Sequence, residues 1–201
     1  MNNGLHVFAV TGGIATGKST FCKLLQKFLP EAVVFDADAC VKDLYQRSDI
    51  KSALSKHFGS SIINGEGVVD KVALRQRVFA DASDKAFLES IFHPKVREEC
   101  LALLAQTHKV GASRVFVAEV PLLFENGFDF GQSANLLVAT SKETQIQRLK
   151  KRNAWDDDAV TAALAAQLPI SEKLAMADVV FWNEGRTLAQ QCQRFLRTLT
   201  E

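Results

Sequence analysis

The chain has 201 residues, of which 47% are hydrophobic and 23% are charged. These proportions are typical of one compact globular domain and argue against global disorder. The formal net charge is +1, so the chain lacks the excess of lysine and arginine on which nonspecific nucleic-acid binding depends. No apolar run reaches the ~18 residues that a membrane-spanning helix needs. We expect a cytoplasmic protein that binds neither nucleic acid nor membrane.

The four cysteines and four histidines are scattered, without the close pairs that zinc sites require. We therefore expect neither a disulfide framework nor a structural metal site. We further expect a monomer, with weak self-association left open.

Short apolar runs alternate with longer helical patterns, which indicates βαβ units and a parallel sheet. Nearly continuous apolar runs predict strands that helices cover on both faces. There are five such runs, at Leu5–Thr11, Ala32–Asp36, Arg114–Val120, Ala134–Ala139 and Asp178–Trp182.

Helix starts are predicted from capping signals. Thr140 and Glu143 have the spacing of a capping box, which predicts a helix from there to about Arg152. The three acids at 156–158 mark the start of the next helix, because the helix dipole favours anions at that end. An amphipathic stretch at 187–199 predicts a closing helix.

Residues 39–109 contain no convincing central strand and are predicted to form several helices with a glycine-rich turn at 59–67. The His93-Pro94 pair predicts a helix start there, because proline suits the first turn. By analogy of fold alone, such an insertion beside a parallel sheet holds a second substrate. We expect one domain, with its core at about 1–38, 110–140 and 176–201, the helical insertion at about 39–109 and a lid at about 141–175.

Residues 12–19 match the Walker A pattern G-x-x-x-x-G-K-[ST], between an apolar strand and an amphipathic helix that begins near Lys18. Gly12 and Gly17 allow the backbone to point N–H groups at phosphate oxygens, and the helix N-terminus adds partial positive charge. Lys18 can bridge the β- and γ-phosphates, and the Ser19 hydroxyl can ligate Mg²⁺. The motif predicts nucleotide binding, and no N-K-x-D motif of the GTPase type accompanies it.

Further motifs run in order along most of the chain. They are Thr11–Thr20, Asp36-Ala37-Asp38, Glu66-Gly67 with Asp70, Leu74 and Val78-Phe79, Leu88-Glu89 with Ile91 and His93-Pro94, Val120–Glu125, Gln145 with Arg148 and Arg152, Gln167, Lys173 with Ala177-Asp178, and Asn183 with Gly185. In this order they resemble the dephospho-CoA kinase family. The resemblance implies a P-loop kinase fold of the α/β class, with a five-stranded parallel sheet, a helical acceptor-binding insertion and a helical lid.

The resemblance also implies an activity and an ATP site. The family phosphorylates the ribose 3′-hydroxyl of dephospho-CoA with ATP and Mg²⁺, giving CoA and ADP in the last step of CoA biosynthesis. The residues that it implies for ATP binding are Gly12, Gly13, Ile14, Ala15, Thr16, Gly17, Lys18, Ser19 and Thr20, with Asn183 and Gly185 near adenine. Ala15 stands where a third loop glycine is common in the family.

Carboxylates at strand ends are the candidates for proton transfer and metal binding. Asp38 is the general base that the resemblance implies, and Asp36 assists through metal-bound water. Either acid has the alternative role of capping the helix that follows. Glu119 is placed like a Walker B acid, with a rim carboxylate that has no metal role as the equal alternative.

Two further groups of residues are expected to contact the substrates. Pro121, Leu122, Leu123 and Phe124 line the acceptor pocket, together with His93 and Arg97, although a histidine before proline is often structural. Arg148 and Arg152 are four residues apart, hence on one helix face, and belong to the lid that closes over the triphosphate. Lys150 and Lys151 beside them leave a solvated basic face as the alternative.

Two competing functions share the nucleotide motif. One is another small-molecule P-loop kinase, acting on a nucleoside, a nucleoside monophosphate, shikimate or gluconate. The other is a nucleotide-binding switch without turnover. The acceptor motifs favour dephospho-CoA over both.

Overall fold

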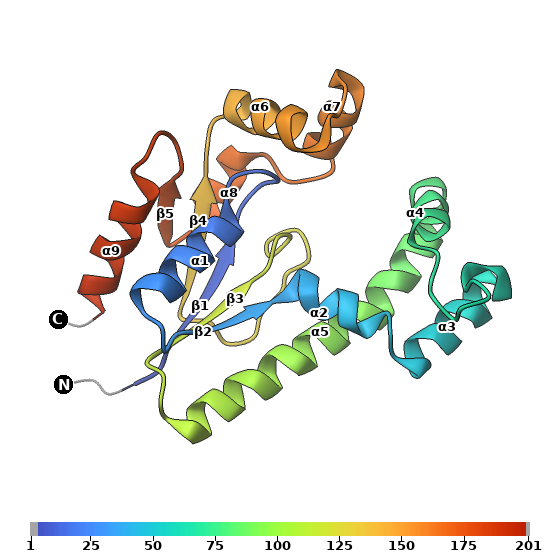
Figure 1. Ribbon diagram of the computed structural model, residues 1–201, viewed down its shortest axis with the longest axis horizontal. Helices are drawn as coiled ribbons and strands as arrows, with labels where there is room; N and C mark the ends of the chain where they lie inside the picture. The colour runs from blue at the N-terminus through green and yellow to red at the C-terminus, as the bar shows by residue number, and fades with distance from the viewer. Residues whose placement is uncertain (1–3, 200–201) are drawn as a thin grey trace. The chain divides into compact units, whose positions relative to one another are not determined.

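The structure is a computed structural model that describes residues 4–199, and its chain divides into two units. One unit comprises the residues up to Asp36 together with those from Cys100 onward, and the other comprises Ala37–Glu99. The first unit contains one parallel sheet with the strand order β2-β3-β1-β4-β5 (Figure 1). The strands are β1 (His6–Thr11), β2 (Val33–Asp36), β3 (Val115–Glu119), β4 (Ala134–Ala139) and β5 (Val179–Trp182).

All five predicted strands are confirmed, each within one residue of its predicted ends. Strand β1 lies in the middle, paired with β3 on one side and β4 on the other. Chain order reverses at this point, and ligands of parallel sheets bind beside such a reversal, at the carboxyl ends of the strands. The register of the sheet places the carboxyl ends of β1, β2 and β3 side by side. Glu119 of β3 pairs with Val10 of β1 on one side and with Asp36 of β2 on the other.

Helices α1 (Lys18–Phe28) and α9 (Leu188–Thr198) pack on one face of the sheet (Figure 1). The core beneath them consists of alternate strand residues, as a pleated sheet requires. Phe21 of α1 is fully buried, and its ring centroid lies 4.3 Å from that of Phe181. The opposite face is also buried, with Ala9 and Phe116 fully covered. The strands that carry the site are therefore buried on both faces.

Helices α6 (Lys142–Asn153), α7 (Asp157–Ala165) and α8 (Ile170–Met176) follow β4. The acids at 156–158 start α7 as predicted, with Asp156 as its N-cap. The predicted capping box at Thr140 is wrong by one residue, because the Ser141 side chain caps α6 by accepting from the Thr144 amide. Thr140 instead donates its hydroxyl to the backbone oxygen of Asn183, a contact 43 residues away.

The second unit is helical, as the sequence predicted. It contains α2 (Ala37–Leu44), α3 (Ser48–Phe58), a 3-10 turn at Ser60–Ile62, α4 (Lys71–Ala80) and the first part of α5 (Ala82–Val110). In this unit, His57 stacks on Phe87 at 3.8 Å between ring centroids and contacts the buried Asp84, with 2.8 Å between His57 Nε2 and Asp84 Oδ1. This contact ties α3 to α5.

The helix start predicted at His93-Pro94 is wrong, because Pro94 lies inside the 29-residue helix α5. A proline removes one backbone hydrogen bond from a helix and disfavours its interior. Here Phe92, Val96 and Cys100 are buried at a spacing of four residues, so packing on either side of Pro94 stabilises a continuous helix. Neither α5 nor any other helix within residues 4–199 is long and apolar enough to cross a membrane.

The central core predicts that replacing a buried and an exposed phenylalanine with alanine will change the free energy of unfolding by very different amounts. Phe21→Ala removes a fully buried ring and should lower the free energy of unfolding by about 3–5 kcal/mol. Phe79→Ala, at a ring that is 81% exposed, should change it by less than about 0.5 kcal/mol. Urea unfolding followed by circular dichroism measures both, and equal losses would contradict this core.

Candidate active site

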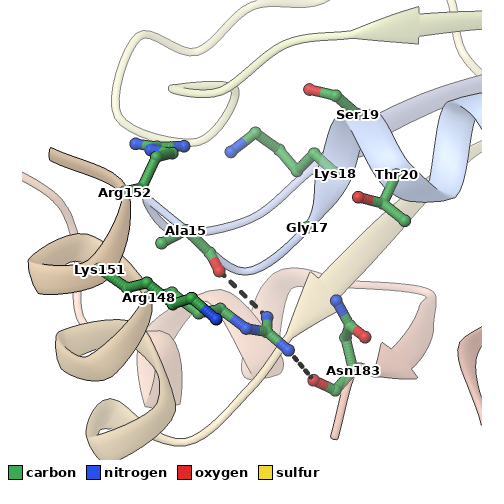
Figure 2. Close-up of a pocket in the computed structure, with 9 residues that line it drawn as sticks. All are labelled: Ala15, Gly17, Lys18, Ser19, Thr20, Arg148, Lys151, Arg152 and Asn183. Carbon is green, nitrogen blue, oxygen red and sulfur yellow. Dashed lines mark hydrogen bonds between the residues drawn. The ribbon is translucent and has the colours of Figure 1, made fainter. Parts of the chain in front are cut away.

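The predicted phosphate loop connects β1 to α1 and borders a cavity of about 710 Å³ (Figure 2). All the residues that line the cavity belong to the first unit of the fold. They are Ala15, Gly17, Lys18, Ser19, Thr20, Arg148, Lys151, Arg152 and Asn183. The structure thus brings together the second half of the loop, the two arginines predicted to belong to a lid, and one of the two residues predicted near adenine. That volume lies within the ~300–1,000 Å³ typical of small-molecule sites.

Side chains outside the loop hold its carbonyl groups. The Thr16 oxygen accepts from Asn183 Nδ2 at 2.7 Å and from Arg148 Nη1 at 3.2 Å. Because a trans peptide is planar, the N–H of the next residue, Gly17, points the opposite way. Gly17 itself has a φ of 102°, and a Cβ there would collide with the Asn183 amide. Glycine is therefore required for this approach of backbone to side chain.

Lys18 and Ser19 sit at the start of α1, where the helix N-terminus faces the cavity. Lys18 Nζ donates to the carbonyl oxygens of Gly12 (3.0 Å) and Gly13 (3.1 Å). The ammonium group is thus held over the loop (Figure 2). The backbone of residues 12–19, which surrounds this position, is called the phosphate cradle below. An anion in the cradle would meet this charge and the positive end of the helix dipole together.

An acidic rim lies beside the loop. The Ser19 hydroxyl donates to Glu119 Oε1 at 2.6 Å, across 100 residues of sequence. Asp36 ends the neighbouring strand in register with Glu119. Burial, and next the Glu119 charge, raise the pKa of the Cys22 thiol well above its usual range, so the thiol stays neutral and donates to that carboxylate. The rim offers hydroxyl and carboxylate oxygens to a cation.

The two lid arginines have different environments. Arg148 donates to the backbone oxygens of Ala15 (3.1 Å) and Asn183 (2.9 Å), as the dashed lines in Figure 2 show. Arg152 is exposed, and its Nε donates to Asn153 Oδ1. Arg152 and Lys18 direct their charged ends to the same side of the loop (Figure 2). Arg148 therefore supports the loop, while Arg152 presents charge to the cavity.

The segment after β5 contributes a contact that the sequence did not reveal. The Glu184 carboxylate accepts from the Ser141 amide at 2.9 Å and from the Thr140 hydroxyl at 3.3 Å, at the start of α6. Hydrogen bonds from Ser141 are the main cause that lowers the pKa of Glu184 to about 2. Asn183, one residue earlier, contacts the loop, whereas Gly185 does not line the cavity.

The residues expected at the acceptor site fall in both units. In the first unit, the segment 121–124 follows β3, and the Thr11 hydroxyl donates to the Pro121 oxygen at 3.3 Å. Leu123 is only 2% exposed and packs in the core, while Leu122 and Phe124 are partly exposed. In the second unit, Asp38 lies exposed in the first turn of α2. His93 and Arg97 are one turn apart on α5, half-buried and exposed respectively.

A parallel sheet of this order, a Walker A loop at its central strand and a basic helix, α6, beside that loop define a P-loop kinase. A sequence model of the family described as dephospho-CoA kinase matches residues 6–189. The chain belongs to the dephospho-CoA kinase family.

Individual relatives and solved structures are similar to this chain over nearly its whole length. The dephospho-CoA kinase of Anaeromyxobacter dehalogenans is 38% identical over 202 positions, covering 97% of this chain and 92% of the relative. The solved structure of TT1252 from Thermus thermophilus has a TM-score of 0.80 and 29% identity, with 98% of this chain and 97% of that chain covered. The dephospho-CoA kinase from Campylobacter jejuni has a TM-score of 0.71 and 28% identity, with 96% of each chain covered.

The Glu184 contact predicts a pH-dependent stability. Glu184→Gln removes a charge that the start of α6 stabilises, so it should lower the free energy of unfolding at pH 7. Because folding lowers the pKa from 4.5 to about 2, this contribution is complete above pH 4.5 and disappears as the pH falls toward 2. Urea titrations between pH 7 and pH 3 should show the gap between wild type and variant closing.

The exposed loop acid Glu31 provides the control for that series. Glu31→Gln should leave the free energy of unfolding nearly unchanged at each pH. A gap for Glu184→Gln that stayed constant from pH 7 to pH 3 would show that the charge does not contribute.

Proposed function

We propose that this chain transfers the γ-phosphate of ATP to the 3′-hydroxyl of the ribose of dephospho-CoA, which completes CoA synthesis. The acceptor oxygen forms a bond to the γ-phosphorus, while the bond from that phosphorus to the β–γ bridging oxygen breaks. ADP leaves with the electron pair, and the hydroxyl proton passes to a carboxylate. The observation that carries the proposal is the anion cradle at residues 12–19 in a chain of this family.

The phosphates of ATP would bind to the backbone of residues 12–19 and to the side chains around it. The β- and γ-phosphates would take the N–H groups on the inner side of the loop and the start of α1. Lys18, which lies over the loop, would exchange its carbonyl contacts for phosphate oxygens. Arg152 would spread the charge of the transferring group, since a guanidinium stays protonated and donates in a planar fork. Asn183 and Gly185 would lie near adenine.

The acidic rim suits Mg²⁺, a hard cation that prefers oxygen ligands and keeps several waters. The Ser19 hydroxyl would bind the ion, with Asp36 or Glu119 acting through water. Within residues 4–199, no three His, Cys, Asp or Glu side chains form a cluster able to hold a metal. A cation that ATP phosphates help to bind needs no such cluster. When bound, Mg²⁺ neutralises charge on the β- and γ-phosphates.

Asp38 is the carboxylate to which we assign the proton. It lies in the first turn of α2, two residues after β2 ends, so it follows the rim of the sheet in sequence, and its side chain is exposed. Leu122 and Phe124 would give the acceptor an apolar surface, and His93 and Arg97 would offer donors to its phosphates. Contacts to the distant pantetheine arm would position the ribose for transfer.

The test of the proposed reaction is ADP release with purified protein, ATP and Mg²⁺, with and without dephospho-CoA. We expect rapid release only with dephospho-CoA and a product phosphorylated at the ribose 3′ position, identified by mass spectrometry and phosphorus NMR. AMP and adenosine should lose kcat as well as affinity, because they lack the remote contacts. Equal turnover of adenosine would indicate a nucleoside kinase, and no turnover of any acceptor would indicate a nucleotide-binding switch.

Asp38→Asn tests the proposed base. The amide keeps the size of the side chain and loses the proton acceptor, so kcat should fall by about 10²–10⁴-fold while ATP affinity stays near that of wild type. Asp43→Asn, on the same helix and exposed, is the matched control and should leave kcat unchanged. If Asp38→Asn kept kcat within about threefold of wild type, well under the expected loss, Asp36 would become the candidate base.

A further inference from the structure

Two glutamines from the segment after β4 hold the middle of the phosphate loop. Gln145 of α6 donates from Nε2 to the Ile14 oxygen at 2.7 Å. Gln167, between α7 and α8, accepts from the Ile14 amide with Oε1, also at 2.7 Å. Gln145 is only 6% exposed, so its amide is built into the protein rather than resting on the surface. These contacts fix two successive peptide units, 13–14 and 14–15.

The orientation of the second peptide unit has a direct consequence for phosphate binding. Gln145 holds the Ile14 oxygen, so the N–H of Ala15 in the same planar unit points away from Gln145. Ala15 lines the nucleotide cavity, whereas Gln145 and Gln167 line a separate cavity with Gly13. Among residues 4–199, no hydrogen-bond acceptor is found for the Ala15 amide. That amide is thereby presented to a phosphate.

The same contacts support a strained residue. Ala15 has a φ of 61°, in the left-handed region that residues with a Cβ seldom adopt. Such conformations persist only where neighbouring contacts determine them. Here Gln145 holds the carbonyl before Ala15, and Arg148 holds the carbonyl of Ala15 itself. Space is also limited on this side, because a Cβ at Gly13 would lie 2.6 Å from Gln145 Nε2.

Gln167 is anchored in turn by a buried ion pair. Lys173 of α8 is fully buried, and its Nζ lies 2.6 Å from Glu125 Oε1. The same oxygen accepts from the Leu168 amide at 3.0 Å, so it holds the residue next to Gln167. Breaking a buried ion pair is costly, which makes this a firm attachment. The segment after β3 is thus linked through residues 167–168 to the phosphate loop.

We propose that Gln145 and Gln167 are positioning residues for phosphoryl transfer, which orient the peptides on both sides of Ile14 and so present the Ala15 amide to the nucleotide phosphates. This inference rests on the proposed ATP-binding role of the loop. Neither glutamine touches the reacting atoms. Each acts through the backbone of Ile14, and the loss of either should weaken nucleotide binding without affecting the acceptor.

The experiment uses Gln145→Met and Gln167→Met, which keep side-chain length and remove the amide. Each should weaken ADP binding, measured by calorimetry, by about 5- to 10-fold, as expected for one lost hydrogen bond. Steady-state kinetics should show a similar fall in kcat/KM for ATP, with the KM for dephospho-CoA within about twofold of wild type. Gln147→Met, on the exposed face of the same helix, is the matched control and should change neither.

A double-mutant cycle separates positioning from general stability. Ala15→Gly removes the strain at φ 61°, because glycine adopts positive φ readily. If Gln145 acts by holding this conformation, Gln145→Met should weaken ADP binding by only about two- to threefold in the Ala15→Gly background, because part of its effect is then already relieved. A purely structural role of Gln145 would give the same loss in both backgrounds.

Three results would overturn the proposal. They are unchanged ADP affinity in Gln167→Met, an equal loss in Gln147→Met, or an undiminished effect of Gln145→Met in the Ala15→Gly background. If Gln145→Met does not fold, Gln167→Met carries the test alone. ADP binding needs no acceptor, so failure here leaves the proposed reaction intact. Conversely, ADP binding with these losses but no turnover of dephospho-CoA would refute the reaction and leave the positioning role.

Discussion

Five consecutive backbone carbonyls, from residue 12 to residue 16, each accept a hydrogen bond from a side chain of the protein. Lys18 serves the first two, Gln145 the third, and Arg148 the fourth and fifth. Since each peptide is planar, holding the oxygen on one side directs the N–H to the other. Dipoles that are already oriented cost no reorganisation when an anion binds or charge develops. The geometry of the whole site depends on this constraint.

The donors to these carbonyls come from parts of the chain that the fold must first bring together. Gln145 and Arg148 lie on α6 after β4, and Asn183 follows β5, which pairs with β4. Glu184, next to Asn183, binds the start of α6, so these two segments are also tied to each other. The phosphate loop therefore takes its shape from α6 and from the segment after the edge strand β5, as well as from its own glycines.

The register of β2 and β3 brings the acidic side chains of the rim together beside the loop. Glu119 is opposite Asp36 on β2 and accepts from Ser19 at the start of α1. One buried carboxylate thus connects helix α1 with the strand that leads to α2. Ser19, Asp36 and Glu119, the Mg²⁺ ligands that we propose, all belong to the first unit and lie on regular elements, which would hold their positions accurately.

Sequence reasoning predicted the strands, the position of the loop between β1 and α1, and the positions of Asp36 and Glu119 at strand ends, because each depends on local pattern. The roles of these residues in phosphate and metal binding stay predictions. Buried parallel strands are continuous apolar runs, and the loop is a short motif with fixed spacing. The helix start predicted at Pro94 is wrong because buried residues on either side of this proline outweigh its local preference. The contacts of Gln145 and Gln167 with Ile14 join residues 131 and 153 positions apart in the sequence, so no local sequence pattern predicts them. The roles of Asp38, His93 and Arg97 stay predictions.

The most direct test of this account is a pair of crystal structures of the protein, one free and one with ADP and Mg²⁺. The account predicts that the backbone of residues 12–17 superposes in the two structures, with the contacts from Gln145, Arg148 and Asn183 retained. Only the Lys18 side chain should exchange its carbonyl partners for phosphate. A free structure in which the peptide after Ile14 or Thr16 is flipped, with its N–H away from the cavity, would contradict it.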